Sequence, residues 1–150
     1  MRKQTETRVR KKARGELGMS LLEMMIVLAI MALVATIAAP RLINQLSRAK
    51  SQAATVEIDA IAQSLEYYNL ELGRYPGEEE GLKALQEAPP GAEFWNGPYM
   101  DAGEDGLRDP WDRPYQYRYP GEHGAFDVYS LGADGEAGGD GENRDVGNWM

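Results

Sequence analysis

The chain has 150 residues, of which 43% are hydrophobic and 27% charged, a composition that suits one modest domain plus an anchoring segment and excludes a wholly disordered chain. It contains no cysteine, which excludes a disulfide framework, a thiolate metal site and a cysteine nucleophile. Residues 1–18 hold seven basic and two acidic residues, whereas residues 19–150 hold nine basic and 22 acidic ones, so a leader of net charge +5 precedes a body of −13. Because no basic stripe remains after residue 50 to follow a phosphate backbone, we expect no nucleic-acid binding.

The first predicted element is an apolar segment at residues 21–39. Its 19 residues carry a single charge, Glu23. As a helix the segment reaches roughly 28 Å, close to the ~30 Å hydrocarbon core of a membrane. The basic residues before it predict that the N-terminus stays in the cytoplasm and that the acidic body lies outside.

Two ordinary interpretations of this segment leave Glu23 unexplained. A secretory signal peptide combines a basic start, a shorter apolar core and a small-residue cleavage site, which Ala38-Ala39 imitates. A plain signal anchor tolerates the length of the segment but has no use for a carboxylate, which needs a partner in lipid.

A third interpretation gives Glu23 a role. The run Gly18-Met19-Ser20-Leu21-Leu22-Glu23 resembles the prepilin cleavage motif of type IV pilins and their relatives, although the residue after the glycine is more often Phe in that family. The resemblance implies that a prepilin peptidase cuts between Gly18 and Met19 and methylates the new N-terminus at Met19. Glu23 can then pair with the freed amino group of an adjacent subunit, which neutralises both charges and fixes the axial register of the two subunits.

The helical pattern continues beyond the apolar segment. Apolar residues recur mostly at spacings of three and four up to Leu72, neither Pro nor Gly occurs between residues 41 and 72, and Gly73 can end the helix. We therefore predict one helix over residues 19–72, about 54 residues and roughly 80 Å long, which Pro40 kinks or loosens. Two helices separated at Pro40 are the alternative.

The remainder predicts a small α+β body. A turn at residues 74–76 precedes a short helix over residues 78–86, and alternating residues at 115–119 and 126–131 predict strands joined by a hairpin loop at 120–124. We expect about three short antiparallel strands packed on the second half of the long helix.

The order of motifs in this body is similar to that of the major pseudopilins of the bacterial type II secretion system. The motifs are Arg74-Tyr75-Pro76, Gly81-Leu82-Lys83-Ala84-Leu85, Gly97-Pro98-Tyr99, Asp109-Pro110-Trp111-Asp112-Arg113-Pro114-Tyr115 and the ending Ser130-Leu131-Gly132-Ala133-Asp134-Gly135 with Asp145-Val146-Gly147-Asn148-Trp149. Asp112 stands where the family usually has Gly. The resemblance implies a pilin-like ladle fold with a cleaved leader at 1–18, a transmembrane and filament-core helix at 19–40 and a periplasmic domain at 41–150.

Residues 131–145 form an acidic, glycine-rich end. Hard oxygen donors without His or Cys suit Ca²⁺, but the spacing does not match an EF-hand, and by composition a solvated acidic loop is the simpler interpretation. The resemblance implies a calcium ion held by Asp134, Asp145 and the backbone carbonyl of Leu131, with Asp140 as a further ligand. We expect Trp149 to pack the tail on the body.

The resemblance implies a structural subunit and not an enzyme: a single-pass protein of the inner membrane that polymerises into a periplasmic pseudopilus and drives export of folded proteins across the outer membrane. The partners it implies are further copies of the chain, minor pseudopilins, the prepilin peptidase, and the inner-membrane assembly platform with its ATPase.

We expect His123, the only histidine, to be a solvated loop residue. A type IV pilus pilin for adhesion or motility is the first alternative, although such pilins commonly carry a C-terminal disulfide; a signal-anchored periplasmic binding protein or hydrolase is the second.

Overall fold

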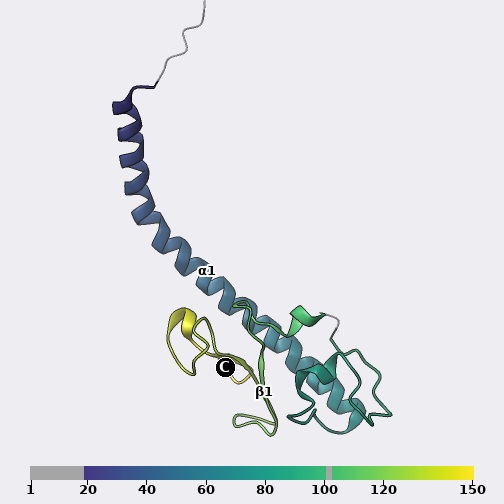
Figure 1. Cartoon of the computed structure of the whole chain (residues 1–150). Helices are drawn as coiled ribbons and strands as arrows, with labels where there is room; N and C mark the ends of the chain where they lie inside the picture. The colour runs from purple at the N-terminus through teal and green to yellow at the C-terminus, as the bar shows by residue number, and fades with distance from the viewer. Residues whose placement is uncertain (1–18, 101–102) are drawn as a thin grey trace, which may run out of the picture. The chain divides into compact units, whose positions relative to one another are not determined.

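The computed structural model describes residues 19–100 and 103–150, so Gly18 and the leader lie outside the described residues. Figure 1 shows one long helix, α1 (Leu21–Leu72), followed by short elements. These are the 3₁₀ helices η1 (Gly81–Leu85), η2 (Glu104–Leu107) and η3 (Gly141–Asn143) and the strands β1 (Gln116–Arg118), β2 (Asp127–Ser130) and β3 (Val146–Gly147). The predicted α+β class is confirmed. The chain divides into two compact units, one ending at Pro40 and the other running from Arg41 to Met150.

Helix α1 is one element that includes Pro40, as predicted, and it begins two residues later than expected. Its C-terminal end follows from Gly73, which has a φ of +73° and donates its N–H to the carbonyl of Asn69 at 2.8 Å. A left-handed glycine of this kind ends a helix without steric cost.

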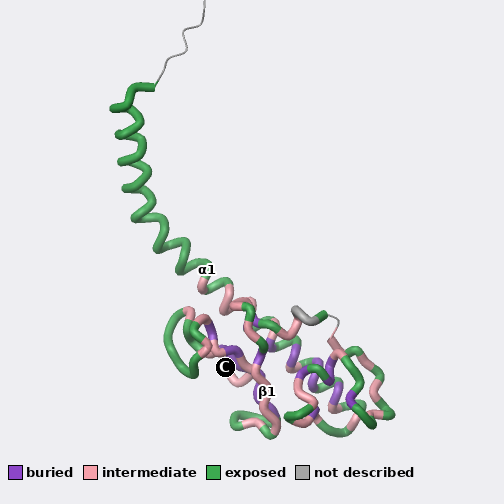
Figure 2. The backbone as a smooth tube through the Cα atoms, in the orientation of Figure 1, coloured by how far each residue is buried: buried purple, intermediate pink, exposed green. Residues whose placement is uncertain are grey.

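Burial differs sharply along α1 (Figure 2). Every residue from Leu21 to Leu46 is exposed. From Ala54 onward one face is buried, formed by Ala54, Ile58, Ile61, Ser64, Leu65 and Tyr68. Among the described residues, α1 is the one helix long and apolar enough to cross a membrane, with a mean hydropathy of 2.5 in its most apolar stretch. The apolar surface of its first half is therefore not covered by any part of the chain that the structure describes.

The three strands form an antiparallel sheet in the order β1-β2-β3, in which Tyr117 pairs with Val128 and Ser130 with Val146. The buried face of α1 shares a core with residues from η1, from the sheet and from the position just before β2, namely Leu82, Leu85, Val128, Val146 and Phe126. A long helix on a small sheet is thus confirmed for the unit that begins at Arg41.

Two predicted elements are shorter than expected. β1 has three residues because Pro114 and Pro120 flank it and have no N–H for the ladder. The predicted helix at 78–86 is a hydrogen-bonded turn followed by η1, since Gly81 has a φ of +56°, which an α-helix does not accommodate.

Candidate functional site

The N-terminal end of α1 carries the residues predicted for processing and assembly. Met19 is 61% exposed and precedes the helix, and Glu23 lies in its first turn, where the helix dipole favours a carboxylate. Within the described residues the Glu23 side chain is exposed and makes no hydrogen bond or ion pair. Any partner of this carboxylate therefore lies outside the described residues.

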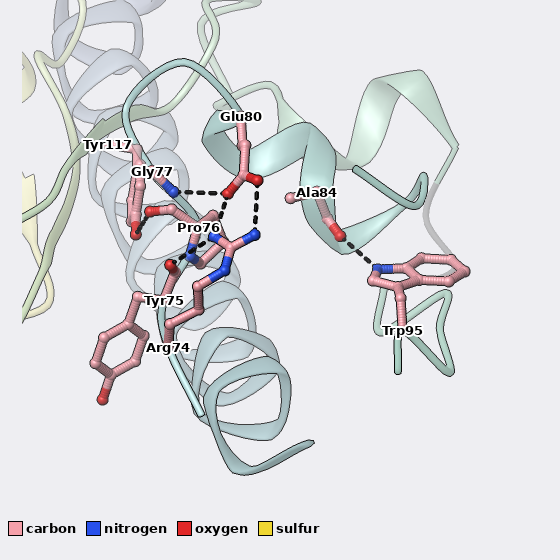
Figure 3. A network of polar contacts seen from close by, with 8 residues as sticks. All are labelled: Arg74, Tyr75, Pro76, Gly77, Glu80, Ala84, Trp95 and Tyr117. Atoms are coloured by element: carbon pink, nitrogen blue, oxygen red, sulfur yellow. Dashed lines mark hydrogen bonds and ion pairs between the residues drawn. The ribbon is translucent and has the colours of Figure 1, made fainter. Parts of the chain in front are cut away.

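The turn after α1 is closed by an ion pair (Figure 3). Arg74 donates two hydrogen bonds to Glu80, at 2.5 and 2.7 Å, and the N–H of Gly77 donates to the same carboxylate at 2.8 Å. The hydrogen bond from Arg74 lowers the pKa of Glu80 below its ordinary value. This network explains the Arg74-Tyr75-Pro76 motif: its arginine fixes the direction in which the chain leaves the helix.

Two further hydrogen bonds attach neighbouring segments to this turn, as Figure 3 also shows. The Tyr117 hydroxyl on β1 donates to the carbonyl of Pro76 at 2.9 Å, and the indole N–H of Trp95 donates to the carbonyl of Ala84 at 2.9 Å. The sheet and the loop around Trp95 are therefore tied to the same short stretch of backbone.

Three tyrosines outside α1 donate to glutamates on α1. Tyr115 donates to Glu57 at 2.6 Å, Tyr75 to Glu66 at 3.1 Å and Tyr99 to Glu71 at 2.5 Å. Burial raises the pKa of Tyr115, which keeps its hydroxyl protonated as a donor. Sequence reasoning missed these bonds, although each tyrosine belongs to one of the motifs quoted above.

Asp109 organises the turn before β1. Its Oδ1 accepts the N–H groups of Trp111 and Arg113 at 3.0 and 2.9 Å, and its Oδ2 accepts the hydroxyl of Ser130 at 2.5 Å. This carboxylate therefore has a structural role in the turn. In the same turn Asp112 has a φ of +66°, a left-handed backbone conformation that glycine adopts at less cost than an L-residue.

The glycine-rich loop at residues 131–145 turns through its glycines. All five of them have a positive φ, namely Gly132, Gly135, Gly138, Gly139 and Gly141. At Gly139 an added Cβ would lie 2.7 Å from the carbonyl oxygen of Asn143, so no side chain fits. A few hydrogen bonds close the loop. The N–H of Ala133 donates to the backbone carbonyl of Glu142 at 2.9 Å, the indole N–H of Trp111 donates to the Glu142 carboxylate at 3.2 Å, and Arg113 donates to the carbonyl of Gly132 at 2.5 Å.

The residues predicted to bind calcium occupy different environments in this loop. Asp145 is half-buried: its Oδ2 accepts the N–H of Gly138 at 2.9 Å, while its Oδ1 is buried without a hydrogen-bond partner. Asp134 is exposed and accepts the N–H of Glu136 at 3.1 Å, Asp140 is exposed directly before η3, and Leu131 is half-buried. Within residues 19–100 and 103–150 no three Asp, Glu, His or Cys side chains cluster as a metal cage, so an ion here would also need backbone oxygens such as that of Leu131.

The C-terminal tail packs on the sheet, as predicted for Trp149. Its ring stacks on His123, with centroids 4.1 Å apart, and meets Tyr129 edge-on. The Nδ1 atom of His123 also lies 3.1 Å from Oδ2 of Asp127. Burial acts to raise the pKa of the Asp127 carboxyl, but hydrogen bonds from residues 122 and 123 together lower it below its ordinary value. His123 is thus exposed in its loop, as expected, and its contacts with Trp149 and Asp127 hold the ring in place.

Comparisons with known proteins follow the same division of the chain. The family model "Type II secretion system (T2SS), protein G" matches residues 41–149, and the model "Prokaryotic N-terminal methylation motif" matches residues 13–39. The type II secretion system core protein G of Vibrio cholerae is 39% identical over 141 residues, which cover 93% of this chain and 95% of that protein. The protein of the same name from Pseudomonas aeruginosa is 39% identical over 144 residues, which cover 91% of this chain and 96% of that protein. The crystal structure of the major pseudopilin from the type 2 secretion system of enterohaemorrhagic Escherichia coli matches with a TM-score of 0.60 and 31% identity over 73% of this chain and 95% of that one.

Proposed function

The chain belongs to the type II secretion system protein G family. We propose which of its residues act in leader cleavage, in membrane insertion and in assembly of the filament. Members of this family are the major structural subunits of the pseudopilus, which polymerises to export folded proteins from the periplasm. This agrees with the sequence interpretation, and the alternative of a type IV pilus pilin is not favoured.

The observation that carries the proposal is the fully exposed apolar half of α1 with one carboxylate in its first turn. The prepilin peptidase removes residues 1–18 on the cytoplasmic side and methylates Met19. The helix over 19–40 then spans the inner membrane, with residues 41–150 in the periplasm.

Intact-mass measurement of the protein from membranes tests the cleavage step. The expected species starts at methylated Met19, and a Gly18→Leu variant keeps its leader. A wild-type mass that includes residues 1–18 in secreting cells would contradict it.

In assembly, the Glu23 carboxylate accepts the amino group of Met19 from an adjacent subunit. An unpaired charge inside the filament core would be costly, and pairing removes both charges at once. Glu23→Ala is expected to be cleaved and inserted normally but to give far fewer filaments and little secretion. Glu93→Ala, which removes another exposed carboxylate, is the control. A wild-type filament yield from Glu23→Ala would reject the pairing.

The remaining partners follow from the place of the family in the secretion machine. The chain is a structural subunit without catalysis of its own; the inner-membrane assembly platform and its ATPase add it to the filament, and minor pseudopilins occupy the tip. Cross-linking and mass spectrometry of membranes that contain the whole machine should recover these proteins with the chain. Recovery of the chain with itself alone would count against them.

A calcium ion in the loop at 131–145 is the last part of the proposal. The buried, unpartnered Oδ1 of Asp145 supports it, because such an oxygen is costly unless a cation or donor satisfies it. Asp134, Asp145 and the Leu131 carbonyl would hold the ion, with Asp140 as an additional ligand. Calcium titration of a soluble fragment, residues 41–150, is expected to show one site that Asp145→Ala removes and the control Glu136→Ala retains. Equal binding by both variants would place the ion elsewhere.

A further inference from the structure

Basic and acidic residues are separated along the part of α1 that follows Pro40. Residues 41–56 contain three basic residues and no acidic one, and residues 57–150 contain six basic and 21 acidic residues. The change of sign falls inside one helix, between Lys50 and Glu57. A surface that carries both signs, separated along its length, can bind a shifted copy of itself.

The exposed face of α1 repeats this separation at a fixed spacing. Arg41 and Arg48 are seven residues apart, Asp59 and Glu66 are also seven apart, and each acid lies eighteen residues after the corresponding arginine. Eighteen residues make about five helical turns, so all four side chains lie on one face. All four are exposed, and this face points away from the buried one that includes Ile61.

None of the four charges is neutralised within the described residues. Arg41, Arg48 and Asp59 make no ion pair or side-chain hydrogen bond there, and Glu66 accepts a bond only from the neutral hydroxyl of Tyr75. The face therefore offers two cations and two anions to a partner.

We propose that this face docks a second, parallel copy of the chain that is shifted along the helix axis by eighteen residues, about 27 Å. The shift sets Arg41 against Asp59 and Arg48 against Glu66. It also brings together the uncharged residues of the face, pairing Gln45 with Gln63, Ala49 with Tyr67 and Gln52 with Leu70.

The uncharged pairs match in size as well as position. The small Ala49 leaves room for Tyr67, which is 59% exposed, and the flexible Gln52 covers Leu70, which is 80% exposed. Burial of such apolar surface favours association. The same register thus satisfies charge and covers exposed apolar groups.

The arrangement selects a copy of the chain over a membrane surface. An anionic bilayer would attract Arg41 and Arg48 but repel Asp59 and Glu66, whereas a shifted copy satisfies all four. Each chain gives its arginines to one neighbour and its acids to another, so the contact does not close on itself and generates a filament. The inference rests on polymerisation of the chain and adds the register of one contact.

Cysteine cross-linking tests the register in the full-length protein, assembled by its own secretion machine. The chain has no native cysteine, and a short bismaleimide can bridge helices whose axes lie about 8–10 Å apart. Gln45→Cys with Gln63→Cys in one chain is expected to give a ladder of multimers, and the control Gln45→Cys with Gln52→Cys to give little. A stronger ladder from the control, with filaments still formed, would overturn the register but leave the filament function intact.

Exchanging the charges of one pair distinguishes a second copy of the chain from a lipid surface as the partner of this face. Arg41→Glu alone and Asp59→Arg alone are each expected to lower the cross-linked ladder from cysteines at 45 and 63 several-fold, and the double variant to restore it. Failure of the double variant to restore the ladder would overturn the pairing. If Arg41→Glu lowered the ladder and Asp59→Arg left it unchanged, the arginine would contact the membrane, and the proposal would also fail.

Discussion

The turn after α1 and the loop before the C-terminus both depend on a carboxylate, and the two carboxylates are satisfied to different extents. Glu80 accepts two bonds from Arg74 and one from Gly77, so its charge is balanced within the chain. Asp145 accepts one backbone N–H, and its other oxygen is buried without a partner. The carboxylate of the first region is satisfied within the chain, whereas that of the second has one buried oxygen without a donor, which the proposed calcium ion would satisfy.

The difference also appears in how the two regions are packed. The region around Glu80 lies against α1, with which it shares the apolar core and the hydrogen bond from Tyr75 to Glu66. The loop at 131–145 contains no buried large apolar residue and is held by a few hydrogen bonds. We therefore expect the stability of the first region to be independent of metal and that of the loop to depend on it.

The largest expected effect comes from the core of the first region. Leu65 is fully buried, so Leu65→Ala should lower the free energy of unfolding of residues 41–150 by about 2–5 kcal/mol. Urea unfolding with calcium and with chelator should give the same loss. Leu70→Ala, at an 80% exposed position, is the control and should change stability by less than about 0.5 kcal/mol. A loss that differed with calcium would break the separation of the two regions.

Glu80→Gln should have a smaller effect, about 1 kcal/mol, because the ion pair with Arg74 is partly exposed and screened. The pKa of Glu80 is lower in the folded chain than its ordinary value of 4.5. Its contribution is therefore present at neutral pH and is lost as pH falls below 4.5 through the folded pKa. Unfolding of wild type and variant at falling pH should show their difference shrink. The neighbouring Glu79→Gln is the control, and a difference that grew in acid would contradict the network.

How far these features follow from the sequence depends on the kind of pattern that encodes them. The helix, its end at Gly73 and the hairpin were predicted because apolar spacing and glycine placement are local signals. The tyrosine bonds were not, since the partners of Tyr115 and Tyr99 lie 58 and 28 residues away and periodicity identifies a face but not a partner. The composition of residues 131–145 predicted an acidic, glycine-rich loop, but not which oxygen of Asp145 would be buried without a donor.

The smallest expected effect concerns Asp112. Its left-handed backbone costs an L-residue free energy that glycine avoids, and its ion pair with Arg108 is exposed. Asp112→Gly should raise the free energy of unfolding by about 0.5 kcal/mol, whereas Asp112→Ala should lower it. Thermal unfolding of the two variants checks the sign, and a loss in both would show that the aspartate side chain contributes more to the turn than its backbone strain costs.

The most direct test of the contrast between the two regions is the thermal unfolding of residues 41–150 after chelation and after adding back each metal. A calcium ion that binds only the folded state stabilises it by about 2.7 kcal/mol at a hundredfold excess over Kd. We predict a clear rise of Tm with Ca²⁺ and little with Mg²⁺, which demands a tighter octahedral site. Asp134→Ala and Asp145→Ala should each remove most of the rise, and Asp140→Ala should weaken it. An equal response to the two metals at matched ionic strength, or a calcium shift that survives both substitutions, would contradict the account.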